Sequence, residues 1–256
     1  MSGQHLFNLR DKTAYVTGGL GLVGSAICRA LASCGSTTIA LDTEPSIRQS
    51  AFTDFEALPF DATNMERLEK NLDLLEAKHG PADIWVNSAY PFSDNYRLSR
   101  LETQTVTSWR ENIDLQLNSY CLISNCIASR MASRGGGSII NMGSIYGLVS
   151  ADFDMYQGTE MMLPPVYSAV KGGIINYTRY LASYYAKDSV RVNVICPGGV
   201  SNGQPSDFVE KYNERTPMGR MAEADEIGGP TVFLASDAAS YVTGAVLAVD
   251  GGWTAI

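Results

Sequence analysis

Histidine is scarce in this 256-residue sequence, which contains only His5 and His79, far apart in the chain. A metal site built on histidine side chains is therefore not expected. A Ser-His-Asp triad is not expected either, because neither histidine lies in a recognisable motif. There are five cysteines, an odd number with no C-x-x-C or zinc-type spacing. We expect free, buried thiols and no bound metal.

Positive charge and long apolar runs are also lacking. Lysine and arginine number 19 against 27 aspartates and glutamates, which gives a formal net charge of −8. This balance argues against a nucleic-acid partner, because such proteins meet the phosphate backbone with broad positive surfaces. No stretch approaches the roughly 20 consecutive apolar residues that cross a bilayer, and the N-terminus lacks the apolar core of a signal peptide. We expect a soluble cytoplasmic protein with no membrane partner.

Short apolar strands alternate with helical segments along the whole chain, from "TAYVT" near the N-terminus to "GAVLAVDGG" near the C-terminus. Residues 63–80 have the spacing of an amphipathic helix that begins with the capping pattern of Thr63 and Glu66 and ends at Gly80. This alternation predicts an α/β fold: a doubly wound parallel sheet with helices on both faces, the Rossmann fold. We expect a single domain over residues 1–256.

A glycine pattern, G-x-G-x-x-G, stands between the first strand and the first helix, at Gly19, Gly21 and Gly24. Glycine lets the backbone turn tightly and approach a pyrophosphate, at which the helix N–H groups are aimed. Asp42 ends the second strand, where a carboxylate can hold both hydroxyls of an adenosine ribose and repel a 2′-phosphate. We therefore expect NAD as the cofactor. Asp42 could instead be a solvated turn residue, and Arg48 nearby leaves room for NADP.

Tyr167 and Lys171 stand four residues apart at the start of a predicted helix, in "PPVYSAVKGG". Positions four apart share one face of a helix, so the phenol and the ammonium can point into one space. A neighbouring cation favours the phenolate and would lower the pKa of the tyrosine toward neutral pH. The alternative is an ordinary amphipathic helix, in which the tyrosine packs inward and the lysine reaches solvent.

Six motifs occur in order along the chain: "VTGGLGLVG", "NSA", "NMGS", "YSAVK", "PGGV" and "VDGGW". Together they resemble the single-domain branch of the short-chain dehydrogenase/reductase family over nearly the whole chain. The resemblance implies that Tyr167 exchanges a proton with the reacting oxygen and that Ser144 hydrogen-bonds the same oxygen. It also implies that Lys171 lowers the pKa of the tyrosine and holds the nicotinamide ribose.

The resemblance further implies which residues surround the two ligands. Those expected to bind the cofactor are Gly18, Gly19, Gly21, Leu22, Val23, Gly24, Asp42, Asp61, Ala62, Asn87, Ser88, Ala89, Pro197, Gly198 and Val200. Those expected to contact the substrate are Tyr90, Tyr146, Tyr156 and Gly199.

The sequence departs from the family pattern at several positions. Leu22 stands where the single-domain branch has a glycine, and Gly21 supplies a turn one residue earlier. Gln116 stands at the asparagine that helps to position a proton-relay water, and we expect its amide to take this catalytic role. Tyr90 replaces a glycine and Asn202 a threonine, so both side chains could reshape the pocket.

The segment between Ser144 and Tyr167 is about ten residues longer than is usual in the family, and long connections are commonly functional. We expect residues 145–166 to form an extended pocket insert that suits a polyhydroxylated ligand, and residues 201–219 to form a substrate loop. A surface excursion or a subunit contact is the alternative for the insert. The insert also resembles that of family members associated with flagellin or surface-sugar modification.

These observations predict an NAD(H)-dependent oxidoreductase that interconverts a secondary alcohol and a ketone on a sugar-like or otherwise polar substrate. One alternative is a 3-oxoacyl or small-alcohol reductase of the same family. Another is a catalytically silent nucleotide-binding scaffold, motivated by Gln116 and the altered glycine pattern. The resemblance also implies a homotetramer or homodimer, with the long helices near residues 105–131 and 165–186 packed across two-fold axes.

Overall fold

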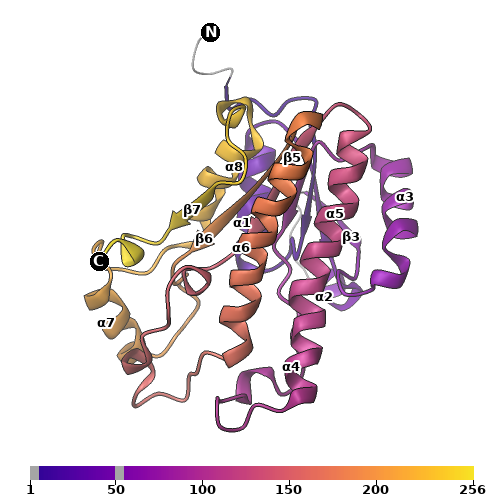
Figure 1. Ribbon diagram of the computed structural model, residues 1–256. Helices are drawn as coiled ribbons and strands as arrows, with labels where there is room; N and C mark the ends of the chain where they lie inside the picture. Colours follow the sequence, from indigo (N-terminus) through magenta and orange to yellow (C-terminus); the bar gives the residue numbers. More distant parts are fainter. Residues whose placement is uncertain (1–5, 50–54) are drawn as a thin grey trace.

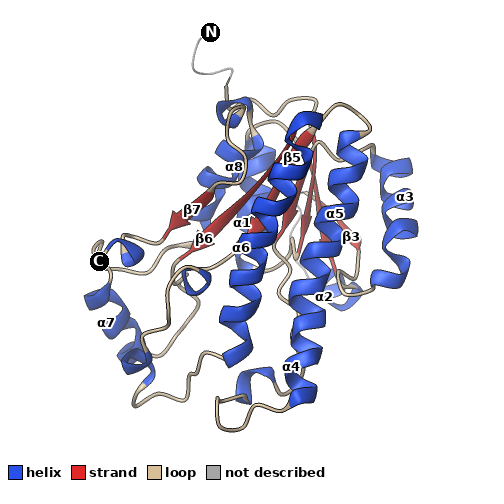
Figure 2. Ribbon diagram, viewed as in Figure 1, coloured by secondary structure: helices blue, strands red, loops and turns tan. Residues whose placement is uncertain are grey.

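The fold is built on a parallel sheet of seven strands in a computed structural model that describes residues 6–49 and 55–256. The strand order is β3-β2-β1-β4-β5-β6-β7, and every neighbouring pair runs parallel (Figures 1 and 2). This arrangement confirms the predicted doubly wound sheet. The strands are β1 (Thr13–Thr17), β2 (Thr37–Asp42), β3 (Glu56–Pro59), β4 (Ile84–Asn87), β5 (Gly137–Met142), β6 (Val190–Pro197) and β7 (Val246–Val249).

Helices cover both faces of the sheet. Successive side chains of a strand point to opposite faces, so the apolar strands need cover on both. Tyr15 and Trp85 are buried in a cluster with α3, α5 and α6, whereas Val16 and Val86 are buried in a second cluster with α1 and α8. Helices α5 and α6 lie side by side across the first face (Figure 1). The helices are α1 (Leu22–Ser33), α2 (Glu44–Gln49), α3 (Leu68–His79), α4 (Val106–Asn112), α5 (Ser119–Ala132), α6 (Pro165–Tyr185), α7 (Ser206–Arg215) and α8 (Gly228–Ala235).

The start predicted for the helix over residues 63–80 is wrong. α3 begins at Leu68, after a short 3-10 turn, and has no side-chain cap. The hydroxyl of Thr63 donates instead to the Asp61 carboxylate, at 2.7 Å, so Thr63 belongs to the preceding turn. The predicted end is confirmed, because Gly80 follows the helix with a φ of 90° that favours glycine.

The long helical stretch predicted from residue 105 is present but is not uniform. Thr105 caps α4 by accepting a hydrogen bond from the Ser108 N–H at 3.1 Å. Between α4 and α5, residues Ile113–Asn118 form a π-helical turn that contains Gln116. A π turn of this kind is rare and often lies at a functional site.

Strand order reverses between β1 and β4. From this point the chain adds β2 and β3 toward one edge of the sheet and β5, β6 and β7 toward the other. Thr17 and Asn87 are paired at the carboxyl ends of these two strands. Ligands of open α/β sheets bind in the crevice beyond such a switch point. The topology therefore places the candidate site above Thr17 and Asn87.

Other sequence features are located as follows. In the part of the chain that the structure describes, no helix is long and apolar enough to cross a membrane. His5 lies outside the described residues. The cysteines are free thiols, of which three are buried (Cys28, Cys126 and Cys196) and two are partly exposed (Cys34 and Cys121).

Candidate active site

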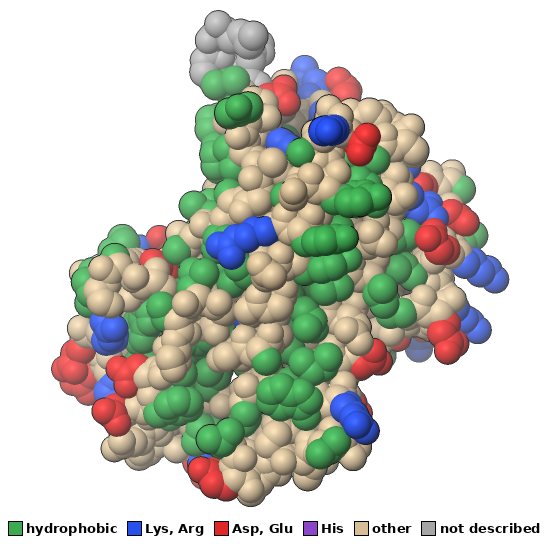
Figure 3. Space-filling view, in the orientation of Figure 1, with side chains coloured by type: hydrophobic (Ala, Val, Ile, Leu, Met, Phe, Trp, Pro, Cys, Tyr) green, Lys and Arg blue, Asp and Glu red, His purple; other side chains and the backbone are tan. Residues whose placement is uncertain are grey.

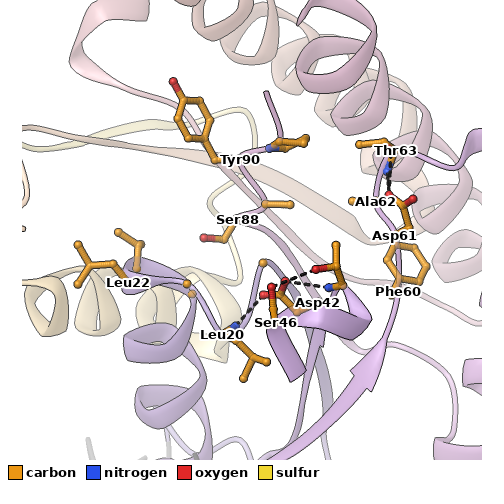
Figure 4. Close-up of a pocket in the computed structure, with 17 residues that line it drawn as sticks. Leu20, Leu22, Asp42, Ser46, Phe60, Asp61, Ala62, Thr63, Ser88 and Tyr90 are labelled. Atoms are coloured by element: carbon orange, nitrogen blue, oxygen red, sulfur yellow. Dashed lines mark hydrogen bonds between the residues drawn. The ribbon is translucent and has the colours of Figure 1, made fainter. Parts of the chain in front are cut away.

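A cavity of about 760 Å³ lies beyond the carboxyl ends of β1, β2 and β4 (Figure 4). The turn from Gly18 to Gly24 forms one wall, and at both of its ends the backbone packs too closely for a side chain. Gly18 has a φ of 65°, and a Cβ on it would lie 2.6 Å from the Cα of Ala89. A Cβ on Gly24 would overlap the carbonyl oxygen of Gly18. Glycine is therefore required at both ends of the turn.

The first turn of α1 opens into this cavity. Its N-cap residue is Gly21, and no side chain of the described residues caps the helix start. The first N–H groups of a helix have no partner within the helix, and together with the helix dipole they attract an anion. Leu22 and Val23, in this first turn, line the cavity. The arrangement suits the pyrophosphate of a dinucleotide.

Asp42 closes the other side of the turn (Figure 4). One of its carboxylate oxygens accepts a hydrogen bond from the Leu20 N–H at 3.1 Å, and the other accepts from the Thr43 N–H at 2.8 Å. The carboxylate lines the cavity and keeps lone pairs that could accept hydrogen bonds from ribose hydroxyls. Asp42 thus both stabilises the turn and lines the cavity.

Most of the residues predicted at the cofactor line this cavity. They are Gly18, Gly21, Leu22, Val23, Gly24, Asp42, Asp61, Ala62, Ser88 and Ala89. Sequence reasoning missed several neighbours of these residues, namely Leu20, Thr43, Ser46, Phe60, Thr63 and Pro91. Adjacency to the predicted residues was the signal for most of the missed ones.

Gly19 and Asn87 are not among the residues that line the cavity, and they support it from behind. A Cβ on Gly19 would lie 2.7 Å from the Cβ of Ala40, so this glycine allows the turn to pack on β2. The Asn87 amide accepts a hydrogen bond from the Trp85 indole at 2.8 Å and donates to Asn141 at 2.8 Å. Its side chain therefore fixes the strand ends and does not face the cavity.

Ser144, Tyr167 and Lys171 meet in a smaller cavity of about 220 Å³, which the predicted residues Pro197, Gly198 and Val200 also line. Val23, Ser88 and Tyr90 belong to the walls of both this cavity and the dinucleotide-sized one. The three candidate catalytic side chains therefore adjoin the space for a cofactor.

The helix α6 presents both members of the Tyr-x-x-x-Lys pair to the same space, as its periodicity predicts. The Lys171 ammonium is buried and lies 5.6 Å from the centroid of the Tyr167 ring. It donates a hydrogen bond to the Met142 carbonyl at 2.9 Å. The interpretation of Lys171 as a residue that reaches solvent is wrong.

Burial controls the ionisation of this pair. It raises the pKa of Tyr167 well above its ordinary range, although a hydrogen bond with Ser144 acts in the opposite direction. Burial also lowers the pKa of Lys171 to about 8. The predicted lowering of the Tyr167 pKa by Lys171 is therefore wrong for this structure, because the loss of water outweighs other effects on the phenol.

Gln116 lies in the π-helical turn and is buried. Its amide is close enough to Tyr96 to lower the pKa of that hydroxyl. Neither polar atom of the side chain has a hydrogen-bond partner of good geometry among the described residues. A buried amide of this kind calls for a further polar group, such as a water molecule.

A third cavity, of about 1110 Å³, begins at Ser144 and Tyr167 and extends away from the sheet. Part of the insert, residues 158–164, and part of the loop after β6 line it. Each of the four residues predicted at the substrate lies in its wall: Tyr90, Tyr146, Tyr156 and Gly199.

Phenol hydroxyls gather in the walls of this cavity. The hydroxyls of Tyr90 and Tyr96 lie 2.6 Å apart, and the Tyr156 hydroxyl donates to that of Tyr146 at 3.3 Å. Each hydroxyl can both donate and accept, so the walls can exchange hydrogen bonds with a ligand that carries several hydroxyls. The aromatic rings supply apolar surface beside these polar groups.

Comparison with known proteins agrees with this geometry. A family profile described as enoyl-(acyl carrier protein) reductase matches residues 21–254. Galactitol 2-dehydrogenase (L-tagatose-forming) of Cereibacter sphaeroides is 35% identical, over 99% of this chain and 99% of its own. Post-translational flagellin modification protein A of Campylobacter coli is 30% identical, over 96% of this chain and 99% of its own. The chain belongs to the short-chain dehydrogenase/reductase family.

Solved structures of similar proteins hold two different cofactors. A short-chain dehydrogenase from Leptospira borgpetersenii with bound NAD+ is 34% identical, with a TM-score of 0.86 over 96% of this chain and 94% of that one. A gluconate 5-dehydrogenase from Burkholderia cenocepacia, in complex with NADP and tartrate, is 26% identical, with a TM-score of 0.85 over 99% of each chain. This short-chain dehydrogenase/reductase therefore has a relative with bound NAD+ and another with bound NADP.

Proposed function

We propose that this protein is an NAD(H)-dependent oxidoreductase that interconverts a secondary alcohol and a ketone on a sugar-like or similarly polar substrate. One observation carries the proposal. Ser144, Tyr167 and Lys171 stand where the dinucleotide-sized cavity meets a larger cavity walled by phenol hydroxyls. A reacting carbon held there has a proton donor on one side and space for a nicotinamide on the other.

When bound, the nicotinamide supplies or accepts the hydride. The raised pKa of Tyr167 keeps its phenol protonated at neutral pH, so in reduction Tyr167 can donate a proton to the carbonyl oxygen. Ser144 would hydrogen-bond the same oxygen and stabilise the charge that develops on it. Lys171 would hold the nicotinamide ribose and place positive charge near the phenol. Gln116 would hold the water that relays protons behind them.

NAD is the proposed cofactor because of Asp42. Its carboxylate suits two ribose hydroxyls, whereas a 2′-phosphate would meet a like charge. The relative with bound NAD+ supports this choice, and the relative with bound NADP makes it a point to test. The glycine turn and the uncapped start of α1 would receive the pyrophosphate of either nucleotide.

A polar substrate is proposed on two grounds. The insert at residues 145–166 and the loop at residues 201–219 contribute to a large cavity with several hydroxyl groups in its walls. The named substrate of one relative is galactitol, a polyhydroxylated alcohol. The similarity to a flagellin modification protein keeps a role in surface-sugar modification among the proposals.

We also propose a cytoplasmic homodimer or homotetramer built from one folded domain. Hydrophobic side chains gather over α5 and α6 on the face shown in Figure 3. Tyr177, Tyr180 and Tyr184 stack along α6, and the last two are more than half exposed. Exposed apolar patches of this kind are typical of protein interfaces.

The description of the matched profile names an acyl substrate, and this favours a second candidate, a 3-oxoacyl or small-alcohol reductase. A reductase of acyl or small apolar substrates would use the same Tyr167 and Ser144 on a less polar ligand. Activity on 3-oxoacyl thioesters and not on sugar alcohols or sugar acids would establish this alternative.

The test is a comparison of Tyr167→Phe with the wild type on sugar alcohols and aldonates, with NAD and NADP in parallel. Loss of the proton donor should lower kcat by at least about a hundredfold while NADH still binds, as followed by its fluorescence. The control is Tyr241→Phe, at a fully exposed phenol. Full activity in Tyr167→Phe would refute Tyr167 as the proton donor. A wild type that binds NADH but turns over none of these substrates would favour a nucleotide-binding scaffold.

A further inference from the structure

Arg97 is the one lysine or arginine among the described residues that line the large cavity. It lies in a short 3-10 turn, Tyr96–Leu98, in the segment between β4 and α4. We propose that Arg97 forms an oxyanion subsite and that the substrate is a hydroxylated compound with a carboxylate or phosphate group. This inference rests on the proposed function, since it names the substrate class of the same site.

The first support is that the guanidinium has no competing acid. Within the described chain, no carboxylate forms an ion pair with Arg97. Other arginines are paired, such as Arg130 with Asp73 at 2.7 Å. An arginine without a carboxylate partner keeps its planar set of donors for two parallel hydrogen bonds to an oxyanion.

The second support is that the side chain, although exposed, packs on an aromatic ring. The central carbon of the guanidinium lies 4.9 Å from the centroid of the Phe92 ring, and Phe92 stacks on Tyr96 at 5.6 Å. A cation over an aromatic face is attracted by the ring and loses part of its freedom to move. The N–H groups at its edge remain available to a ligand.

The third support is the position of Arg97 relative to the chemistry. Its charge is near enough to Tyr90 and Tyr96 to oppose the rise that burial causes in the pKa of both phenols. Tyr90 packs edge-on against Tyr167, with 5.9 Å between the ring centroids. Arg97 and Tyr167 thus lie at two ends of one aromatic wall. A ligand could present its anionic end to Arg97 and a hydroxyl carbon to Tyr167.

Two acids of the same cavity narrow the ligand class further. Glu160 comes from the insert and Asp207 from α7, and both line the cavity. Carboxylates accept hydrogen bonds from hydroxyls but repel a second anion. The ligand therefore carries its negative charge at the Arg97 end and hydroxyls elsewhere, as a sugar acid or a sugar phosphate does.

The experiment is a calorimetric titration of the full chain, with and without NADH, with three probes of similar size: D-glucitol, D-gluconate and D-glucitol 6-phosphate. At least one of the two anionic probes should bind more tightly than neutral glucitol. Arg97→Ala should remove that preference, with a loss on the order of tenfold or more for the anion, and should leave glucitol binding unchanged. Arg97→Lys should restore only part of it, because lysine lacks the two-pronged geometry.

Arg100→Ala is the matched control. Arg100 is exposed, as Arg97 is, and lies three residues further on, but it does not line the cavity. It removes the same charge and should leave the anion preference intact. A preference for gluconate identifies the group as a carboxylate, and a preference for the phosphate ester identifies it as a phosphate.

Two results would overturn the subsite: anions that bind no better than glucitol, or anion binding that survives Arg97→Ala. Either would leave the proposed oxidoreductase standing if the wild type oxidises neutral polyols. Conversely, Arg97-dependent anion binding without turnover of any probe would support the subsite and count against the proposed reaction.

Discussion

The ammonium of Lys171 donates a 2.9 Å hydrogen bond to the carbonyl of Met142, and this bond ties α6 to the end of β5. Ser144 follows Met142 by two residues, and Tyr167 precedes Lys171 by one helical turn. The serine, the tyrosine and the lysine are therefore held in register by contacts within the protein.

The buried charge of Lys171 should make stability depend on pH. Burial lowers the pKa of Lys171 from its ordinary 10.5 to about 8, so between these values the unfolded chain holds more protons than the folded one. Stability therefore rises with pH in this window. Relative to Lys171→Met, the wild type should gain about 2 kcal/mol of unfolding free energy between about pH 7 and about pH 9.5.

Urea unfolding of the two proteins at matched pH values measures this difference. Parallel curves for wild type and Lys171→Met would show that the lysine has an ordinary pKa and that water reaches it.

Cofactor preference should follow the charge of Asp42. Asp42→Asn keeps an acceptor for only one of the Leu20 and Thr43 N–H groups, and it removes the charge that opposes a 2′-phosphate. The ratio of NADPH to NADH affinity should rise by about tenfold or more, since a like charge costs up to roughly 4 kcal/mol at an effective dielectric of 20 before solvent screening.

Titration with both reduced nucleotides measures the ratio, and Asp61→Asn is the control. Asp61 lines the same cavity, but its substitution should leave the ratio nearly unchanged. A wild type that already prefers NADPH would contradict the assignment of Asp42.

The polar network under the site should contribute to stability. Thr178 and Thr231 are both fully buried, and each donates a 2.8 Å hydrogen bond to a carbonyl one turn earlier, of Ile174 and Ile227. Thr178 alone also accepts a hydrogen bond from the Asn141 amide, at 3.0 Å. Thr178→Val should therefore cost about 1–2 kcal/mol more than Thr231→Val, because it leaves a buried donor unpaired.

Thermal or urea unfolding of the two valine variants checks this difference. Equal costs would mean that the amide of Asn141 finds another partner once the hydroxyl is gone.

Assembly should depend on the exposed tyrosines of α6. Tyr184→Glu places a charge on the aromatic column and should shift the protein to smaller species in sedimentation velocity. Tyr241→Glu, at a phenol that is fully exposed, should not. A wild type that sediments as a monomer at every concentration would contradict the proposed interface.

Local patterns explain what could be predicted from the sequence. Glycine at residues 18–24 and the apolar runs on either side of it specify a strand, a tight turn and a helix without reference to distant residues. The four-residue spacing of Tyr167 and Lys171 follows from helix geometry alone. The glycine turn and the Tyr-x-x-x-Lys face of α6 were predictable for that reason.

Features that depend on tertiary contacts were not predictable. Thr63 had the pattern of a helix cap, but its hydroxyl binds Asp61 instead. The pKa of Tyr167 moves opposite to expectation because sequence spacing reveals a nearby cation but not the loss of water. Arg97 stands in no motif, and only the folded chain brings it to the wall of the cavity.

The close packing of Gly24 on the Gly18 carbonyl bears on how a nucleotide would be recognised. The two backbone segments touch in the folded protein, so the loop has little freedom left to lose when a pyrophosphate arrives. The entropic cost of ordering this loop arises during folding and not on binding. A ligand therefore meets N–H groups that are already aligned. The affinity of such a preorganised turn for a nucleotide depends more on the fit of the nucleotide than on rearrangement of the chain.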